Sequence, residues 1–419
     1  MSISLYVSAA IFILIAVRQW LPETVRIWHI MTLGAITLLL LGQISPTRAF
    51  ESIDWTLIIY LFSVFSIASA LYDAGVSRGI SQYLLAFRTP FLSLLVYTLI
   101  MAVCAAVLTN DAAAVIGVPI AIMMARKMRW GIVPLLILLC AAVTTGSMIT
   151  PVGNPQNILI ANFGSFSNMF LVFGEWIIVP AILTMVIAIW WLKRFLTLTN
   201  EEEIEEVALY EDQGDVKRRW PSIFSGILLF GLIVLGSILH EGGWGYEPSI
   251  AEIGLVACLP IYLASNERLR VLKEVDWPTL LFFIAMFVVT GSLLDSGSLQ
   301  YLLGGLQQRL DEPQIVAVVS FFASQLFSNV PVVEIYLNLL KEHTTATLMM
   351  LSAISTASGN LFIISAASNV IVVQQAEKFG VKPFSFWQFT LWMLPVTVAS
   401  VLLSYFWINW FATTPFVAQ

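Results

Sequence analysis

The segment Thr144–Asn157 reads TTGSMITPVGNPQN and lies inside an apolar run that extends over residues 133–163. Gly153, Pro155 and the amides beside them interrupt a helix in a stretch that is otherwise apolar enough to lie in lipid. Backbone groups left unpaired at such an interruption are tolerated only where protein or a water-filled cavity surrounds them. A second segment, TASGNLFIISAASN at 356–369, aligns with the first without gaps at an offset of 212. Two interrupted helices in corresponding positions predict a functional site.

The rest of the chain has the composition of a membrane protein. Of its 419 residues, 59% are hydrophobic and 11% are charged, whereas soluble domains carry roughly 25% charged residues. Apolar runs of about 20 residues recur, each long enough to cross a bilayer, and they lack the alternation of barrel strands. The predicted fold is therefore an all-α polytopic membrane protein. Its spans are expected near 3–18, 26–43, 54–72, 133–163, 173–195, 221–239, 249–265, 277–294, 344–376 and 386–411.

Two further segments, 90–126 and 313–341, are apolar with a polar break in the middle. Basic residues collect on the cytoplasmic side of short loops. If each segment returns to the side that it entered, 17 of the 20 Lys and Arg residues lie on one side of the membrane. Because single crossings would destroy this asymmetry, the pattern favours hairpins or pairs of crossings, and we predict re-entrant hairpins. Both termini are then outside, and the acidic linker 196–220 is in the cytoplasm.

The two halves of the chain repeat one another. Asp54-Trp55 recurs as Asp276-Trp277 at an offset of 222, and the two polar breaks correspond at an offset of 219. We interpret the shared Asp-Trp pair as a helix cap followed by an interfacial anchor. Each half holds five spans, one of them an interrupted helix, together with a re-entrant hairpin that does not cross the membrane. Because five is an odd number of crossings, the second half is inverted relative to the first. The predicted organisation is a first half with an extra N-terminal span, a linker and a second half, over 1–195, 196–220 and 221–419.

Four short polar segments are expected to converge: Thr109–Asp111, Gly153–Asn157, Ser328-Asn329 and Ser365–Asn369. Opened carbonyls and Asn oxygens offer hard ligands to a cation, and helix N-termini offer N–H groups to an anion or a polar solute. The sequence contains no nucleophile–base pair, metal-ligand cluster or phosphate-binding loop. We therefore expect no enzyme, no catalytic residues, no cofactor and no bound metal. No basic block indicates nucleic acid as a partner.

These motifs resemble the ion transporter superfamily, and within it the arsenite permeases more than the divalent-anion/sodium symporters. The resemblance covers the chain from residue 26 onward and implies a fixed scaffold with a transport unit that moves. It implies that the substrate-binding residues are Asn110, Asp111, Asn154, Pro155, Asn329, Ser365 and Ala366. It implies that the ion-coupling residues are Thr109, Asn110, Asp111, Gly153, Ser328 and Asn329.

The sequence departs from the divalent-anion symporters at positions that set the charge of the site. Asp111 stands where those relatives have Thr, Val330 replaces a second Thr, and Ala366-Ala367 replaces Thr-Pro. Polar contacts are lost and a negative charge is gained, which disfavours a dicarboxylate substrate. An ionisable residue inside a membrane segment is a functional hypothesis by default. We interpret Asp111 as a proton-coupling residue or as the cap of the returning helix, and one residue can do both.

The expected function is secondary active transport of a small oxyanion or its neutral acid in the inner membrane. Proton-coupled arsenite efflux by elevator-like alternating access is favoured, with sodium-coupled anion uptake and sodium/proton antiport as alternatives. The expected partners are a small inorganic substrate, a coupling proton or sodium ion and the lipid bilayer, with a homodimer left open. A passive channel is less favoured because paired broken helices in inverted repeats indicate alternating access.

Overall fold

The structure, a computed structural model, describes residues 2–16, 25–87, 89–164, 166, 168–196, 216–241, 248–298, 309–327 and 329–414. The first half of the chain contains α1 (Ile3–Ala16), α2 (Ile27–Leu40), α3 (Pro46–Glu51), α4 (Trp55–Asp73), α5 (Val76–Leu84), α6 (Pro90–Leu108), α7 (Asn110–Met128), α8 (Ile132–Ser147), α9 (Pro155–Phe163), α10 (Met169–Leu192) and η2 (Lys193–Phe195). The second half contains α11 (Val216–Glu241), α12 (Ile250–Ala264), α13 (Arg268–Glu274), α14 (Trp277–Asp295), α16 (Pro313–Phe327), α17 (Asn329–Leu339), α18 (Thr345–Ser358), η5 (Ile363–Ser365), α19 (Ala367–Lys378) and α20 (Phe386–Phe411). Ser328 and most of the predicted linker 196–220 lie outside the described residues.

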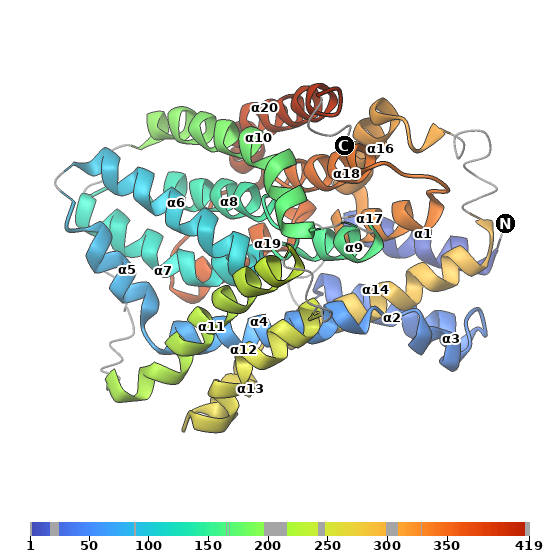
Figure 1. Cartoon of the computed structure of the whole chain (residues 1–419), viewed down its shortest axis with the longest axis horizontal. Helices are drawn as coiled ribbons and strands as arrows, with labels where there is room; N and C mark the ends of the chain where they lie inside the picture. Colours follow the sequence, from blue (N-terminus) through green and yellow to red (C-terminus); the bar gives the residue numbers. More distant parts are fainter. Residues whose placement is uncertain are drawn as a thin grey trace.

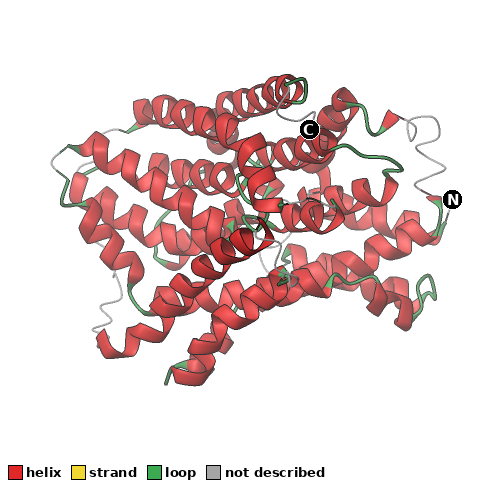
Figure 2. Ribbon diagram, in the orientation of Figure 1, coloured by secondary structure: helices red, strands yellow, loops and turns green. Residues whose placement is uncertain are grey.

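The chain is a helical, polytopic membrane protein. Five segments of the described chain are long and apolar enough to cross a membrane: α4, α6, α10 with η2, α14 and α20. The predicted spans 133–163 and 344–376 are each two helices, α8 with α9 and α18 with α19. The helical path is broken between Ser147 and Pro155 and again between Ser358 and Ala367, where the short helix η5 intervenes. Figure 2 shows loop segments among the helices in the middle of the molecule. The interruptions predicted from the sequence are therefore present.

Local structure recurs at the offset of 222 residues. Asp54 caps α4, its side chain accepting a hydrogen bond from the backbone N–H of Leu57 at 3.0 Å. Asp276 caps α14 in the same way, accepting from the N–H of Thr279 at 3.2 Å. These bonds satisfy N–H groups that the first turn of a helix leaves unpaired. The interpretation of both aspartates as helix caps is confirmed.

Both predicted polar breaks lie between two helices that run antiparallel to one another. Between α6 and α7, Tyr97 Oη donates to the carbonyl of Gly117 at 3.5 Å, and only Thr109 separates the two helices. Between α16 and α17, Tyr336 Oη donates to the carbonyl of Leu310 at 2.7 Å. This contact places the end of α17 beside the start of α16. Each segment therefore folds back along itself as a helical hairpin.

The helices form layers around a buried centre. Figure 1 shows α10 and α20 packed together along one edge, and α11, α12 and α13 along the opposite edge. Helices α7, α8 and α19 lie between these edges and contact one another. Every residue of α8 from Pro134 to Ser147 is buried, as expected for a helix that is apolar on all sides. The interrupted helices and the hairpin tips are thus enclosed by protein.

An ion pair joins the two halves near the end of α14. Arg48 of α3 donates to both carboxylate oxygens of Asp295, at 2.9 and 3.1 Å. The hydrogen bond and the negative charge of Asp295 raise the pKa of Arg48. Because the pair is about half exposed to solvent, it contributes little to stability. Its two-point geometry fixes the orientation of α3 against α14.

Candidate functional site

The tip of the first hairpin is a strained backbone segment. Thr109 is fully buried and has φ +91°, a conformation that is a genuine outlier for a β-branched residue. Its hydroxyl caps α7 by accepting a hydrogen bond from the N–H of Ala112 at 3.3 Å. The next N–H, of Asn110, donates to the carbonyl of Gly153 at 2.8 Å. Strain of this kind persists where the surroundings hold it, and it collects at functional sites.

Asn110 and Asp111 have different environments at this tip. The Asn110 side chain has partners on both sides, because Nδ2 donates to Ser368 Oγ at 3.3 Å and Oδ1 accepts from the N–H of Asp111 at 3.0 Å. Asp111 is 2% exposed, and its Oδ1 has no hydrogen-bond partner among the described residues. Burying an ionised carboxylate without partners is costly, so such a group binds a proton or a cation. Asp111 is therefore the side chain of the tip whose hydrogen-bonding capacity the described protein leaves unfilled.

The break between α8 and α9 is closed by its own side chains. Asn154 caps α9, with Oδ1 accepting from the N–H of Asn157 at 2.9 Å and Nδ2 donating to the carbonyl of Ser147 at 3.2 Å. Pro155 occupies the first position of α9, where its missing N–H has no cost. Gly153 is required for space, since a Cβ there would lie 2.3 Å from the carbonyl oxygen of Ser147. The break is therefore a rigid turn rather than a loose loop.

The second hairpin is held against the second break. In the amide orientation that satisfies its hydrogen bonds, Asn329 donates to the carbonyls of Ser355 at 3.0 Å and Ser365 at 3.1 Å. The Ser365 hydroxyl donates to Oε1 of Gln325 on α16 at 2.7 Å. Ala366, which is 3% exposed, is the N-cap position of α19 and provides no side-chain cap. Asn329 therefore supports the break mechanically, through two N–H groups.

The two breaks share one hydrogen-bond pattern. Asn157 Nδ2 donates to the carbonyls ten and seven residues before it, at 3.2 and 2.9 Å. Asn369 Nδ2 donates to the carbonyls ten and seven residues before it, at 2.8 and 3.4 Å. These two asparagines stand 212 residues apart, the offset read from the sequence. The Oδ1 of Asn157 accepts from Ser352 at 2.7 Å, whereas the Oδ1 of Asn369 has no partner among the described residues.

A large cavity reaches Asp111 from one side of the molecule. Its volume is about 1150 Å³, and its walls come from α4, α7, α13, α14 and α19. Asp276 lines it near Asp111, and their two charges interact. Arg270 is already paired, with Asp73 at 3.3 Å and Glu274 at 2.9 Å. The charged groups that line the cavity are Arg26, Arg270, Lys273, Lys378, Asp73, Asp111, Glu274, Asp276 and Glu377.

The predicted site residues meet at two joints, and the hydrogen bond from Asn110 to Ser368 links the first joint to the second break. Thr109, Asn110 and Gly153 meet at the first joint. Asn329 and Ser365 meet at the second. Asn154 and Pro155 lie at the start of α9, and Ala366 lies at the start of α19. Of all the predicted positions that the structure describes, Asp111 is the one that lines the large cavity.

Three further residues belong to this region and were not among the individual site residues predicted, although Ser368 lies in one of the four polar segments expected to converge. Ser368 binds Asn110, Gln325 binds Ser365, and Asp276 faces Asp111 across the cavity. Ser368 stands beside Asn369 in a segment already singled out, and Gln325 is a polar residue three positions before a hairpin tip. The positions of Ser368 and Gln325 beside these segments are the features of the sequence from which both residues could have been found. Asp276 carries no comparable signal of a role at the site, because its sequence context indicates only a cap.

Comparisons with known proteins agree with a transporter. The family model CitMHS, described as a citrate transporter, matches residues 10–344. The 46 kDa membrane protein of Mycobacterium leprae is 27% identical over 90% of this chain and 92% of its own length. Inner membrane protein YbiR of Escherichia coli is 25% identical over 91% of this chain and 94% of its own length. The silicon efflux transporter LSI3 of Oryza sativa is 24% identical over 87% of this chain and 89% of its own length.

A solved structure supports the same fold. The YdaH transporter of Alcanivorax borkumensis superposes with a TM-score of 0.53 at 14% identity, over 87% of this chain and 88% of that one. At this identity the likeness concerns the fold alone. The family match covers well over half of the chain. The chain therefore belongs to the CitMHS citrate transporter family, and it is a multi-pass membrane transporter rather than an enzyme.

Proposed function

We propose that this chain exports a small, uncharged inorganic oxyacid in exchange for protons that enter the cell. Arsenite in its neutral form, arsenous acid, is the favoured substrate. The observation that carries the proposal is Asp111. Its carboxylate is buried, has an oxygen without a hydrogen-bond partner among the described residues and lines the large cavity. A carboxylate in this position is suited to binding and releasing a proton as the surroundings change.

The two aspartates that line the large cavity support a neutral substrate. Asp111 and Asp276 both line the cavity, and the charge of Arg270 is neutralised by its own partners. Two like unit charges about 4 Å apart cost about 4 kcal/mol at an effective dielectric near 20, roughly a thousandfold in affinity. A multiply charged carboxylate meets this cost, whereas a neutral acid avoids it. The relative named as a silicon efflux transporter supports this substrate class, since silicic acid is also uncharged near neutral pH.

The proposed transport cycle uses two parts of the fold. We define the scaffold as α1–α4 with α11–α14, and the transport unit as α6–α10 with α16–α20. The recurring caps, hairpins and asparagine bonds support two inverted repeats, each with a re-entrant hairpin. Displacement of the transport unit along the scaffold would expose Asp111 to either side in turn. The distribution of basic residues favours a cytoplasmic opening for the large cavity, with both termini outside.

Two competing functions follow from the same observations. The family description favours citrate as a substrate, and the opened carbonyls at the two breaks are ligands suited to sodium. Sodium-coupled anion uptake and sodium/proton antiport therefore remain the alternatives. They differ from the proposal in the driving ion and in the charge of the substrate. A homodimer remains a proposal that does not affect this choice.

Transport into inverted membrane vesicles discriminates between these functions. We expect arsenite, and not citrate or succinate, to accumulate when the vesicle lumen is made acidic, because substrate enters the lumen as protons leave it. A protonophore should abolish the accumulation, and an imposed sodium gradient should not restore it. Vesicles without the protein are the control. Sodium-driven citrate uptake without arsenite transport would overturn the proposal.

A further inference from the structure

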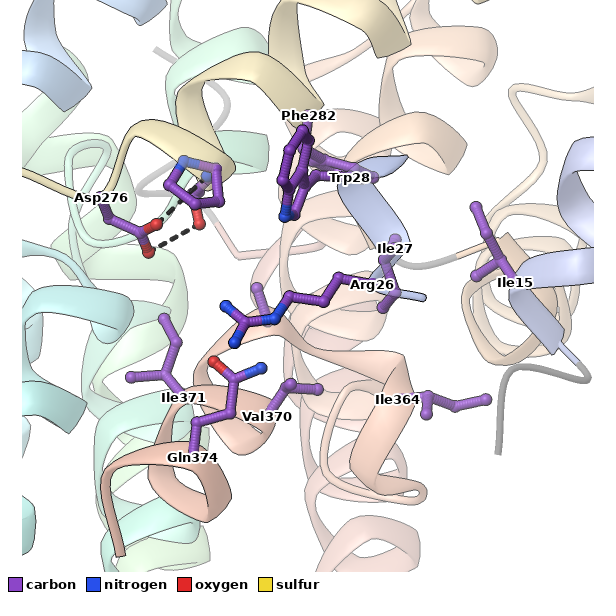
Figure 3. A pocket seen from close by; sticks show the side chains of 13 residues that line it. Ile15, Arg26, Ile27, Trp28, Asp276, Phe282, Ile364, Val370, Ile371 and Gln374 are labelled. Carbon is purple, nitrogen blue, oxygen red and sulfur yellow. Dashed lines mark hydrogen bonds between the residues drawn. The ribbon is translucent and has the colours of Figure 1, made fainter. Parts of the chain in front are cut away.

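A second, smaller cavity lies where the scaffold meets the transport unit. Its volume is about 120 Å³, and it is lined by the end of α1, the first turns of α2 and α14, and η5 with α19. Figure 3 shows Arg26 extending into it from the start of α2, with Gln374 on the side of α19 and Asp276 on the side of α14. None of these residues belongs to the breaks or hairpin tips described above.

The polar groups of this cavity converge from both parts of the fold. Trp28 lines it, and its indole N–H is buried without a hydrogen-bond partner among the described residues. In Figure 3 the indole nitrogen is turned toward the space beside Arg26. The amide of Gln374 offers both a donor and an acceptor. Asp276 offers acceptor oxygens held in place by the hydroxyl of Thr279 at 2.7 Å. A buried donor without a partner calls for an explanation, and a bound ligand supplies one.

We propose that this cavity is a loading site for a single uncharged inorganic oxyacid, which binds there from the cytoplasmic side before it reaches Asp111. The inference rests on the proposed function, because it takes that function's substrate class. A solute of four or five heavy atoms fits the volume, which corresponds to about four waters at roughly 30 Å³ each. Its hydroxyls donate to Asp276 and Gln374 and accept from Trp28 and Arg26.

The position of the cavity agrees with a loading role. Arg26, Asp276, Pro278, Ile371 and Gln374 line both this cavity and the large one that contains Asp111. The two cavities are therefore neighbours, and a solute in the smaller one lies next to the cavity that contains Asp111. Since Trp28 and Asp276 belong to the scaffold and Gln374 to the transport unit, movement of the transport unit separates the binding groups. A ligand that bridges them stabilises the arrangement described here, and displacement releases it.

The test is equilibrium binding of arsenous acid to purified full-length protein at neutral pH, in a cysteine-free background so that no thiol binds arsenic. Trp28→Phe keeps the ring and removes the indole N–H, and Gln374→Leu removes the amide. We expect each variant to raise the dissociation constant about five- to tenfold, the effect of one lost hydrogen bond. Trp387→Phe is the matched control, because Trp387 is 69% exposed on α20, and it should bind as the parent does.

The outcomes separate this proposal from the proposed function. If both variants bind arsenous acid with the parental affinity while the parent transports it, the loading site is refuted and the transport function stands. If the parent neither binds nor transports arsenous acid, both proposals fall. Size-exclusion profiles that match the parent show that a weaker variant is folded. Weaker binding by both variants, with the Trp387→Phe control unchanged, supports the site.

Discussion

Replacing Asp111 by asparagine is expected to abolish the accumulation of arsenite while leaving its exchange across the membrane. Asparagine has the shape of the protonated carboxyl group but does not take up or release a proton near neutral pH. For one proton per substrate, a gradient of one pH unit corresponds to about 1.4 kcal/mol and therefore to about tenfold accumulation. In inverted vesicles with an acidic lumen we expect about tenfold accumulation for the parent and none for Asp111→Asn. Exchange of labelled arsenite should continue within about threefold of the parental rate.

Glu334→Gln is the matched control for this variant. Glu334 also lies on the returning helix of a hairpin, but Asn338 donates to its Oε1 at 3.0 Å. Its carboxylate thus has a partner where the Asp111 oxygen has none. We expect Glu334→Gln to accumulate arsenite as the parent does. Unchanged accumulation by Asp111→Asn would show that Asp111 only caps α7.

Replacing Gly153 by alanine is expected to slow transport strongly by displacing the neighbouring hairpin tip. The added Cβ would lie 2.3 Å from the carbonyl oxygen and 2.7 Å from the Cα of Ser147. The break must then open, and the carbonyl of Gly153 moves away from the N–H of Asn110, which it accepts at 2.8 Å. Overpacking of this kind costs about 1–3 kcal/mol or more. A shift of about 1 Å at a functional tip reduces rates by roughly a hundredfold.

Initial rates of arsenite flux and thermal unfolding of the purified protein measure both effects of Gly153→Ala. The matched control is Gly174→Ala on α10, where an added Cβ meets no atom within 4 Å. Alanine is the better helix former by about 1 kcal/mol, so this control should be as stable as the parent or more so and should transport normally. Parental flux in Gly153→Ala would contradict the rigid break.

The sequence predicts the helices well because one physical requirement dominates them. A segment in lipid must satisfy its backbone internally, so apolar runs become helices and polar breaks become helix ends. The break at Thr109–Asp111 accordingly falls between α6 and α7, with α7 beginning at Asn110. The short helices α3, α5 and α13 were not predicted, because a helix of six to nine residues leaves no apolar run long enough to be recognised.

The site is less predictable, because its contacts join residues that are distant in sequence. The four polar segments were expected to converge, and hydrogen bonds link them: Asn110 contacts both Gly153 and Ser368, and Asn329 contacts Ser365. Most of their amides bind protein groups. Asp111 and Asp276 line the same cavity only because the chain folds so that distant segments surround it, which periodicity does not encode. A role for Trp28 could not be predicted from the sequence either, because a tryptophan near a span end is ordinarily an interfacial anchor. Its buried indole N–H becomes informative only in the folded chain.

The exchange of protons for a neutral inorganic oxyacid can be measured directly in proteoliposomes that contain only the purified protein. Liposomes loaded with arsenite and a pH-sensitive dye are diluted into arsenite-free buffer with a membrane-permeant counter-ion. Because arsenous acid is uncharged, its departure alone leaves the lumenal pH unchanged. For the parent protein we expect the lumen to become acidic as arsenite leaves, with about one proton entering per arsenite. For Asp111→Asn we expect efflux without acidification. Arsenite efflux at constant lumenal pH in the parent protein would show that transport is not coupled to protons.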